Sequence, residues 1–443
     1  METADTPEQM VPPIATPGQA LLPTPRNGSG TSRRRRVRIR VRTFDSFRHV
    51  DYRLVWGGAL LSSGGFWVQQ VIVGWLTYNL TESAFLTSLA LGVDTIPILL
   101  VGPFGGVLAD RWDRRKLLVI VYLYQTLLTL GFSALVFAER VDSWHIFAFI
   151  IMMGASWVVI DPARMSMIPR IVPRENLVNA FALNGLAFNG SRLFAPGIAG
   201  GLLVVAGAGP ALLFEAGLQA TAVILALAIK VRSTESRGGG LASAVGDVRE
   251  AIVYVWSNPL TRSLFLVGTV PALLMMPFVQ GLMPVYTAEV FGVGASGLGL
   301  LMSTFGAGAT VGALTMATVG DVRRKGLLVL LSIGIMGAAM LVFSRNTTYA
   351  LAFPIIMVIS LAMATFFTSI NATLQGSIDD RFRGRVSALY MFTWGMFPIG
   401  SLLAGTLADS YGPRAATLVG GTAILITITV LALGPARALL RDP

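Results

Sequence analysis

Apolar residues occur along the chain in runs of about twenty, separated by short polar segments. A helix of about 20 apolar residues crosses a hydrocarbon core of ~30 Å. The runs lack the strict alternation of apolar and polar residues that is typical of membrane-spanning strands. The pattern therefore predicts an all-α membrane protein with twelve transmembrane helices. The expected spans are residues 54–78, 85–108, 117–138, 144–165, 178–206, 210–231, 262–288, 295–319, 326–344, 348–372, 386–408 and 414–434.

Composition supports this class. Only 13% of the 443 residues are charged and the mean hydropathy is +0.68, whereas a soluble domain has about 25% charged residues. The absence of cysteine and the presence of only two histidines exclude disulfides, thiolate catalysis and a histidine-rich metal site. No lysine follows a phosphate-binding glycine loop, and no nucleophile–base pair or cofactor motif is found. We therefore expect no enzyme activity, no cofactor, no bound metal and no ATP-driven transport.

The net charge of +11 is concentrated on alternate loops. If both termini lie on one side, the loops of that side and the two tails hold 30 of the 34 Lys and Arg residues. By the positive-inside rule, this side is expected to be the cytoplasm. The basic charge is then a topology signal and not a nucleic-acid site. The arginine-rich segment 33–42 is in addition suited to contact with anionic lipid.

Composition also divides the chain into segments. The N-terminal tail is rich in Pro, Thr, Gly and Ser and is expected to be disordered. Within the central linker, apolar residues of 241–256 are spaced by four and three, which predicts an amphipathic helix on the membrane interface. The predicted segments are a basic tail (1–47), a first six-helix bundle (48–231), a cytoplasmic linker (232–261), a second six-helix bundle (262–434) and a C-terminal tail (435–443).

The two halves carry a weak internal repeat. Asp110 and Asp321 each precede a basic cluster and the next apolar run, and Asp161 and Asn371 occupy matching places near the ends of the fourth and tenth spans. A repeat of six plus six spans is typical of transporters that rock two bundles around a site at the membrane midplane.

The segment "GGVLADRWDRRK", residues 105–116, resembles the signature loop between spans two and three of the major facilitator superfamily. Asp113 stands where the wider superfamily has glycine, a departure that is usual in its enterobactin-exporter, macrolide-efflux and transmembrane secretion effector branch. The segments "FWVQQVIVGWLTYNLTESAFLTSLALG" and "DPARMSMIPRIVPRENLVNAFALNG" resemble the same branch, and the likeness covers about residues 48–434. The residues that match the signature loop are Gly106, Asp110, Arg111, Arg114 and Arg115.

The resemblance implies two six-helix bundles in the bacterial cytoplasmic (inner) membrane, with both termini cytoplasmic. It implies export of a small organic molecule, such as a drug, siderophore or natural product, by alternating access of a monomer. The five matching residues are then a conformational latch, in which Asp110 contacts the eleventh span in the outward-facing state. The segment "SRLFAPGIAGG" resembles an exporter-associated motif, in which Pro196 and Gly200 match and favour close helix packing.

Among the charged residues within predicted spans, Asp94, Arg192 and Glu215 are candidates for buried charge. A charge near mid-span costs ~2.5–3.5 kcal/mol on insertion scales, so Arg192 is expected to face protein and to have a partner. Glu215 and Asp94 are the candidate partners of Arg192. The pair serves either as a structural ion pair or in gating and substrate recognition. Without a nucleotide motif, a proton gradient is the expected energy source, and Asp94 and Glu215 are the acids placed to carry the proton.

Aromatic and amide side chains are candidates for a central substrate cavity. Aromatic surface with a few neutral polar groups suits an amphipathic organic molecule. Prolines 271, 277 and 284 are expected to break the seventh span. Uptake of a nutrient, or a lipid scramblase or receptor on the same scaffold, are the alternative functions. The candidate cavity residues are Trp67, Gln69, Gln70, Asn184, Asn189 and Gln280.

Overall fold

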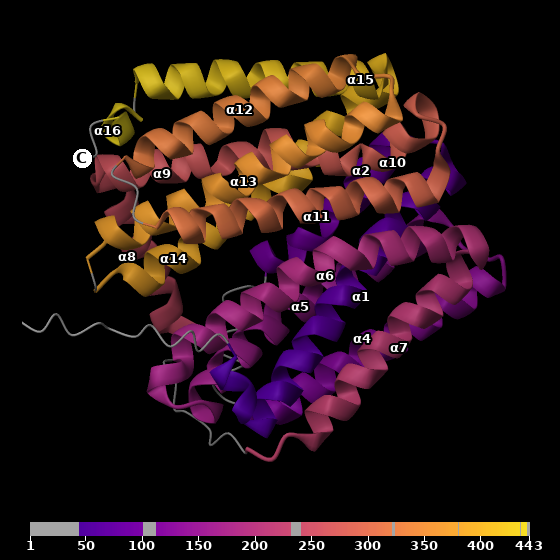
Figure 1. Cartoon of the computed structure of the whole chain (residues 1–443), viewed down its shortest axis with the longest axis horizontal. Helices are drawn as coiled ribbons and strands as arrows, with labels where there is room; N and C mark the ends of the chain where they lie inside the picture. Colours follow the sequence, from indigo (N-terminus) through magenta and orange to yellow (C-terminus); the bar gives the residue numbers. More distant parts are fainter. Residues whose placement is uncertain are drawn as a thin grey trace, which may run out of the picture. The chain divides into compact units, whose positions relative to one another are not determined.

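The protein is helical in a computed structural model that describes residues 44–100, 112–231, 241–320, 324–379, 381–434 and 436–440 (Figure 1). No strand occurs in this part of the chain. Eight helical stretches of the described residues are long and apolar enough to cross a membrane. The prediction of an all-helical chain with many apolar helices is therefore confirmed.

The long helices follow the predicted spans closely. For example, α6 and α11 match the predicted spans 178–206 and 295–319 to within one residue at each end. The helices of the first half are α1 (Val50–Thr81), α2 (Ala84–Gly92), α4 (Arg114–Phe137), α5 (Ser143–Ile171), α6 (Leu177–Val205) and α7 (Ala208–Ala228). Those of the second half are α8 (Leu241–Ser257), α9 (Pro259–Val270), α10 (Met283–Val285), α11 (Gly294–Val319), α12 (Lys325–Arg345), α13 (Tyr349–Ser377), α14 (Arg383–Met391), α15 (Phe397–Leu433) and α16 (Arg437–Leu440).

Proline and glycine explain the irregular places. Proline has no backbone N–H and so leaves a gap in the helical hydrogen bonds. Two π-helical segments, η4 (Pro271–Met275) and η5 (Pro277–Gly281), begin at the prolines that were expected to break the seventh span. The helix α15 is interrupted at Gly412, whose φ of 83° favours glycine. This interruption lies between the predicted spans 386–408 and 414–434.

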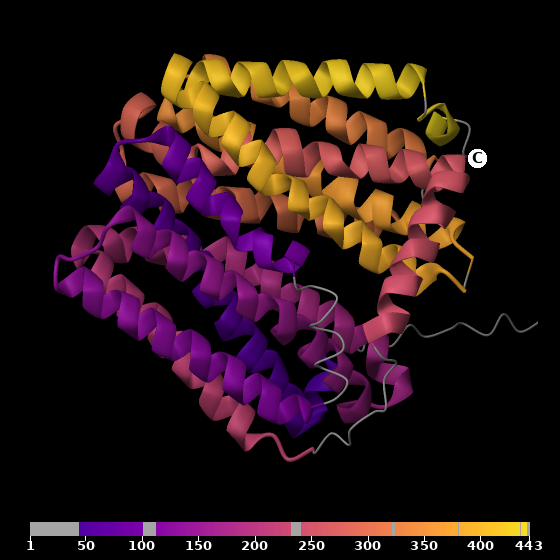
Figure 2. The same ribbon diagram turned by 180° about the vertical axis from the view of Figure 1, so that it is seen from behind.

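Two groups of helices meet along two long seams (Figures 1 and 2). The helix α6 of the first half packs along α11 of the second, and α2 packs along α15. Glycines allow the close approach at α6 and α11, because a Cβ on Gly200 would lie 2.7 Å from the Ala295 carbonyl oxygen. This is the small-residue packing that is typical of membrane helices.

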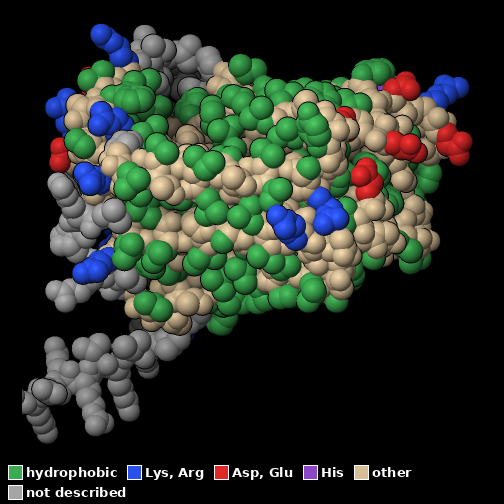
Figure 3. All heavy atoms as spheres, turned by 90° about the horizontal axis from the view of Figure 1, so that it is seen from above, with side chains coloured by type: hydrophobic (Ala, Val, Ile, Leu, Met, Phe, Trp, Pro, Cys, Tyr) green, Lys and Arg blue, Asp and Glu red, His purple; other side chains and the backbone are tan. Residues whose placement is uncertain are grey.

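Apolar side chains also cover the outside of the bundle. On the face shown in Figure 3, hydrophobic side chains are spread over the middle, most Lys and Arg lie toward one end, and most Asp and Glu lie toward the other together with a few basic side chains. Phe194 on α6 and Leu433 on α15 are 66% and 69% exposed. Exposed apolar surface on this scale is typical of a protein that is solvated by lipid.

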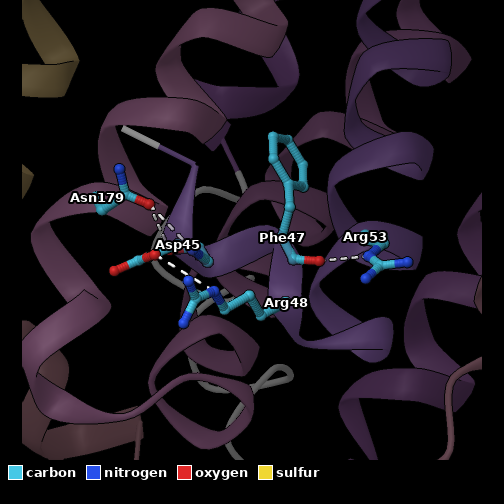
Figure 4. A network of polar contacts seen from close by, with 6 residues as sticks. Asp45, Phe47, Arg48, Arg53 and Asn179 are labelled. Atoms are coloured by element: carbon cyan, nitrogen blue, oxygen red, sulfur yellow. Dashed lines mark hydrogen bonds and ion pairs between the residues drawn. The ribbon is translucent and has the colours of Figure 1, made fainter. Parts of the chain in front are cut away.

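A short helical turn precedes α1 and ties it to α6 (Figure 4). In η1 (Asp45–Arg48), the Ser46 hydroxyl donates to the Asn179 side-chain oxygen at 2.7 Å, and the Ser46 amide donates to the same atom. Arg53 donates to the Phe47 carbonyl, while Arg48 pairs with Asp45 at 3.4 Å. These residues lie at the end of the predicted disordered tail, so the folded chain begins earlier than residue 48.

The linker contains the predicted helix, α8. Its Val255 is buried, whereas Val253 and Trp256 are exposed. The ring of Tyr254 stacks on Phe382, which lies just before α14, with 4.5 Å between the ring centroids. Part of the linker helix is therefore packed on the second half, and its apolar side chains are divided between this contact and the surface.

Candidate functional site

A cavity of about 800 Å³ lies between the two groups of helices. Its wall is formed by side chains from α1, α2 and the segment that follows it, α5 and α6 of the first half. The second half contributes side chains from η5, α11, α14, η7 (Phe392–Met396) and α15. Four of the residues singled out in the sequence lie in this wall, namely Trp67, Gln70, Asp94 and Gln280. The site is thus built from parts of the chain that are more than 200 residues apart in sequence, for example Trp67 and Gln280.

One side of the wall is aromatic. Phe66 and Trp67 on α1 meet Trp157 of α5 and Phe188 of α6. The Phe66–Trp157 and Trp67–Phe188 ring centroids are 5.1 and 5.5 Å apart. Across the cavity, Trp394 stacks on Phe367 at 5.1 Å. A concave, mostly apolar surface of this kind fits a bulky organic molecule.

Asp94 lies in the short turn η2 (Val93–Thr95) at the end of α2. Its Oδ2 accepts a hydrogen bond from the Gln70 amide at 3.1 Å. Its Oδ1 is buried and has no hydrogen-bond partner among the described residues. A Cβ on Gly154 would collide with the backbone of Asp94, so glycine lets α5 press against this turn. Gln70 of α1 therefore holds one oxygen of this carboxylate, and α5 fixes the turn that carries it.

Arg192 lies on α6 behind the aromatic wall and is 6% exposed. Its guanidinium group donates to the Gln280 side-chain oxygen at 3.0 Å. It also lies over the rings of Trp67 and Phe305, at 4.5 and 4.4 Å from their centroids. Each such cation–π contact contributes about 0.5–2 kcal/mol, more when water is excluded.

The expected ion pair of Arg192 is not found. Neither Glu215 nor Asp94 is its partner, and none of the acids that the structure describes comes within ion-pairing distance of it. The reason is geometric: α6 packs on α11, which turns the arginine toward the second half. A neutral amide and two aromatic faces take the place of a carboxylate.

The other predicted residues lie away from the cavity wall. Gln69 is buried, and Asn184 is buried with its amide 3.8 Å from the Met165 sulfur. Asn189 donates to the Gly185 carbonyl one turn earlier in α6. Glu215 is fully buried in the first half, where Thr129 donates to it at 3.4 Å. Its second oxygen has no hydrogen-bond partner in the described chain.

Two ion pairs at the cavity rim were not anticipated from the sequence. Asp161 lines the cavity and pairs with Arg164, three residues later on α5. Arg385 lines the cavity from α14 and pairs with Glu250 of the linker helix at 2.7 Å. The spacing of Asp161 and Arg164 is that of neighbours on a helix surface and was a usable signal. The second pair joins segments that are 135 residues apart, which no local pattern indicates.

The predicted latch loop is only partly described, since Gly106, Asp110 and Arg111 lie outside the described residues. Arg114 is buried. Arg115 donates to the carbonyls of Ala226 and Leu227 at the end of α7. Asp113 accepts from the amides of Arg115 and Lys116 at 2.9 and 3.1 Å and so caps α4. The residue that departs from the superfamily motif therefore has a structural role of its own.

At the end of the bundle that carries Ser83 and Asp409, here called the Asp409 end, the two halves are joined by polar contacts. The Asp409 carboxylate accepts from the amides of Ala84 and Phe85 at 2.6 and 3.1 Å and from the Ser83 hydroxyl at 2.9 Å. The Tyr78 hydroxyl donates to Glu289 at 2.8 Å. The halves are therefore held together at this end.

Comparison with known proteins places this geometry among transporters. Residues 41–439 match the family described as transmembrane secretion effector. The staphyloferrin A transporter of Staphylococcus aureus is 25% identical over 82% of this chain and 91% of its own length. The multidrug efflux pump Tap of Mycolicibacterium fortuitum is 24% identical over 86% and 93%, and macrolide efflux protein A of Streptococcus pyogenes 22% over 85% and 94%.

Solved structures show the same fold. The nucleoside transporter NupG superposes with a TM-score of 0.71 at 13% identity, covering 88% of this chain and 99% of that one. A bacterial homologue of the lysosomal transporter Spinster superposes with a TM-score of 0.66 at 14% identity, covering 89% and 98%. At these identities the likeness is one of fold and does not extend to substrate.

Proposed function

The chain belongs to the transmembrane secretion effector family of the major facilitator superfamily, whose members are membrane transporters and not enzymes, and we propose that it exports a small organic molecule. Two of the relatives are named as efflux proteins, one for several drugs and one for macrolides. The observation that carries the proposal is the cavity of about 800 Å³ whose wall is shared by both halves of the chain. A site between two bundles is accessible to one side or the other as the bundles rock.

We infer that the chain spans the membrane twelve times, as bundles of six helices over 48–231 and 262–434 that are joined by the linker 232–261. The support is the break of α15 at Gly412, which divides one long apolar stretch into two span-length helices. The apolar segment 84–100 adds a further span in the first half.

The charge pattern supports an inner-membrane orientation with both termini in the cytoplasm. The basic loops then face inward and the Asp409 end faces outward. The cavity reaches Asp161 and Arg385, which lie next to the basic loops, while the Asp409 end is joined by hydrogen bonds. The arrangement therefore fits the inward-facing member of an alternating-access pair.

Coupling to protons completes the proposal. Asp94 is exposed to the cavity and has no positively charged partner among the described residues. Such a carboxylate can exchange a proton with the cavity as the protein changes state. The latch residues of the 105–116 loop act at the cytoplasmic end, where Asp110 holds the outward-facing state.

The test is accumulation in an efflux-deficient bacterial host that expresses the full chain. We expect lower accumulation of, and higher resistance to, a subset of a compound panel, with both effects lost when a protonophore collapses the gradient. An expressing strain that accumulates a panel compound above the level of the empty-vector strain would show an importer and overturn the proposal. Glu139→Gln, an exposed loop variant, controls for expression and insertion.

A further inference from the structure

The charges in the cavity wall do not balance. Of the described residues, three with charged side chains line the cavity, namely Asp94, Asp161 and Arg385. Asp161 is paired with Arg164, and Arg385 is paired with Glu250. Asp94 accepts a hydrogen bond from Gln70 and has no positively charged partner among the described residues. Among the described residues, the wall therefore has a single charge without a counter-charge, and it is negative.

The unpaired carboxylate lies beside aromatic faces. Gln70, which holds Asp94, is three residues from Trp67 and four from Phe66 on α1, so all three lie on one face of that helix. Trp157 and Phe188 extend this aromatic surface from α5 and α6. Aromatic rings attract a cation through their negatively charged faces. A carboxylate next to such rings makes a site for a positive group that is attached to an apolar body.

The buried Arg192 does not cancel the unpaired negative charge of the cavity wall. Arg192 is not part of the cavity wall, since Trp67 and Gln280 stand between it and the cavity. Its guanidinium group lies over the two rings of Trp67 and Phe305 and donates to Gln280. A substrate in the cavity therefore meets the Trp67 ring and the Gln280 amide before it meets the guanidinium group.

From these contacts we propose that the cavity binds amphipathic organic cations, with the positive group at Asp94 and the apolar body against the aromatic wall. The proposal rests on the proposed function, because it names the substrate class of the same cavity. It also gives a role to the Asp94 carboxylate, which lines the cavity and has no positively charged partner among the described residues.

The test compares three probes of similar size and different charge on the purified full-length protein in detergent. These are tetraphenylphosphonium, neutral triphenylphosphine oxide and tetraphenylborate. Trp67, Trp157 and Trp394 line the cavity, so binding is followed by quenching of tryptophan fluorescence. We expect saturable binding of the cation at least tenfold tighter than that of the other two probes. Asp94→Asn is expected to raise the Kd of the cation at least tenfold and to leave that of the neutral probe unchanged.

Tighter binding of the anion, or a cation Kd that Asp94→Asn leaves unchanged, would overturn the inference. Glu139→Gln removes an exposed acid far from the cavity and serves as the control for charge. The three-probe comparison on the unaltered protein decides the question even if the Asp94 variant does not fold. Binding is measured without a gradient, so its result stands even if the protein does not export. An exporter of neutral compounds alone would pass the export test and fail the binding test.

A second inference comes from the Asp409 end and does not depend on the substrate. Asp409 accepts three hydrogen bonds from Ser83, Ala84 and Phe85 at the start of α2, in the other half of the chain. The partially positive start of a helix stabilises such a carboxylate. Gly405 makes the approach possible, because a Cβ there would lie 2.6 Å from the Phe85 Cα atom.

The sequence around Asp409 repeats that of the latch loop. Residues 405–409 read "GTLAD" and residues 106–110 read "GVLAD". We infer that Asp409 is a second latch, which holds the Asp409 end closed and must release before the cavity opens there. Residues 405–409 end the eleventh predicted span, and residues 106–110 end the second. The two similar pentapeptides would therefore act at opposite ends of the bundle. Asp409 of the eleventh span contacts the second, whereas Asp110 of the second is expected to contact the eleventh.

Cysteine chemistry tests this latch cleanly, because the chain has no native cysteine. The Ser83 hydroxyl and Asp409 carboxylate are 2.9 Å apart, so Ser83→Cys with Asp409→Cys should form a disulfide on mild oxidation. We expect this bond to abolish transport, and reduction to restore it. A cross-linked protein that still transports would contradict the latch.

A second readout uses a single cysteine at Thr95, which lines the cavity. Asp409→Ala should increase its labelling rate by an impermeant maleimide, added at the Asp409 end, several-fold. Asp142→Ala is the matched control, because Asp142 also caps a helix, α5, but does so in a capping box with His145 inside one half. Equal labelling rates in the two variants would refute the inference.

Discussion

The contact between α6 and α11 gives a sharp prediction about the predicted packing residue Gly200. Its Cα faces the backbone of α11, and an added methyl group would lie 2.7 Å from the Ala295 carbonyl oxygen and 3.0 Å from the Gly299 Cα atom. Backbone atoms cannot move aside as a flexible side chain does. The next residue, Gly201, has nothing within 4 Å of the same added atom.

The magnitude follows from this difference. Alanine in place of glycine favours a helix by about 1 kcal/mol, and both variants gain this. Overpacking at position 200 destabilises only the Gly200→Ala variant, by about 1–3 kcal/mol. With an unfolding entropy of about 2.1 cal/mol/K per residue over 443 residues, the Tm of Gly200→Ala should fall below that of Gly201→Ala by roughly 1–3 °C.

Thermal unfolding of the two variants in the same detergent measures the difference. Transport should fall as well in Gly200→Ala, because this seam joins the two halves that rock against each other in the proposed mechanism. The comparison cancels the helix propensity of alanine and isolates the packing. If Gly200→Ala is as stable and as active as Gly201→Ala, then α6 and α11 do not pack as closely as described.

Three further outcomes are expected. Arg192→Lys should lose about 1–2 kcal/mol of stability in thermal unfolding, because lysine cannot lie flat between two rings while donating to an amide; an unchanged Tm would contradict this. Glu250→Gln should change stability by less than about 1 kcal/mol, because its ion pair is largely exposed, and a larger loss would show that α8 supports the fold. A single cysteine at Glu139 should react with an impermeant reagent from outside and one at Glu175 should not, and the reverse would invert the proposed orientation.

The helices were predictable because a hydrophobic run of membrane length needs no tertiary information. Long described helices such as α6 and α11 follow the expected spans because an apolar run carries its own stop signal, such as Gly412 followed by Pro413 in α15. The irregular seventh span was also predictable, since Pro271 and Pro277 remove backbone donors wherever they occur in a helix.

The cavity was only half predictable, and α1 shows why. Gln69 and Gln70 are adjacent, but neighbours on a helix point about 100° apart. Gln70 and Trp67 face the cavity, while Gln69 is buried elsewhere. In a soluble helix the polar face fixes this rotation, but α1 is apolar nearly all round and is packed on several sides. Which glutamine meets the substrate therefore depends on how α1 packs against α2, α6 and α7.

The free-energy cost of a buried charge correctly predicted that Arg192 has interaction partners, but it did not predict which residues they are. A charge in a membrane helix needs compensation, and a carboxylate was the obvious source. Two aromatic faces and one amide oxygen supply it instead, all three from residues that only the crossing of α6 with α1, η5 and α11 brings together. This affects the charge of the cavity, because Arg192 is stabilised by neutral groups and neutralises neither Asp94 nor Glu215. Asp94, which lines the cavity, is therefore not neutralised by Arg192, as both the proposed proton coupling and the proposed binding of organic cations require.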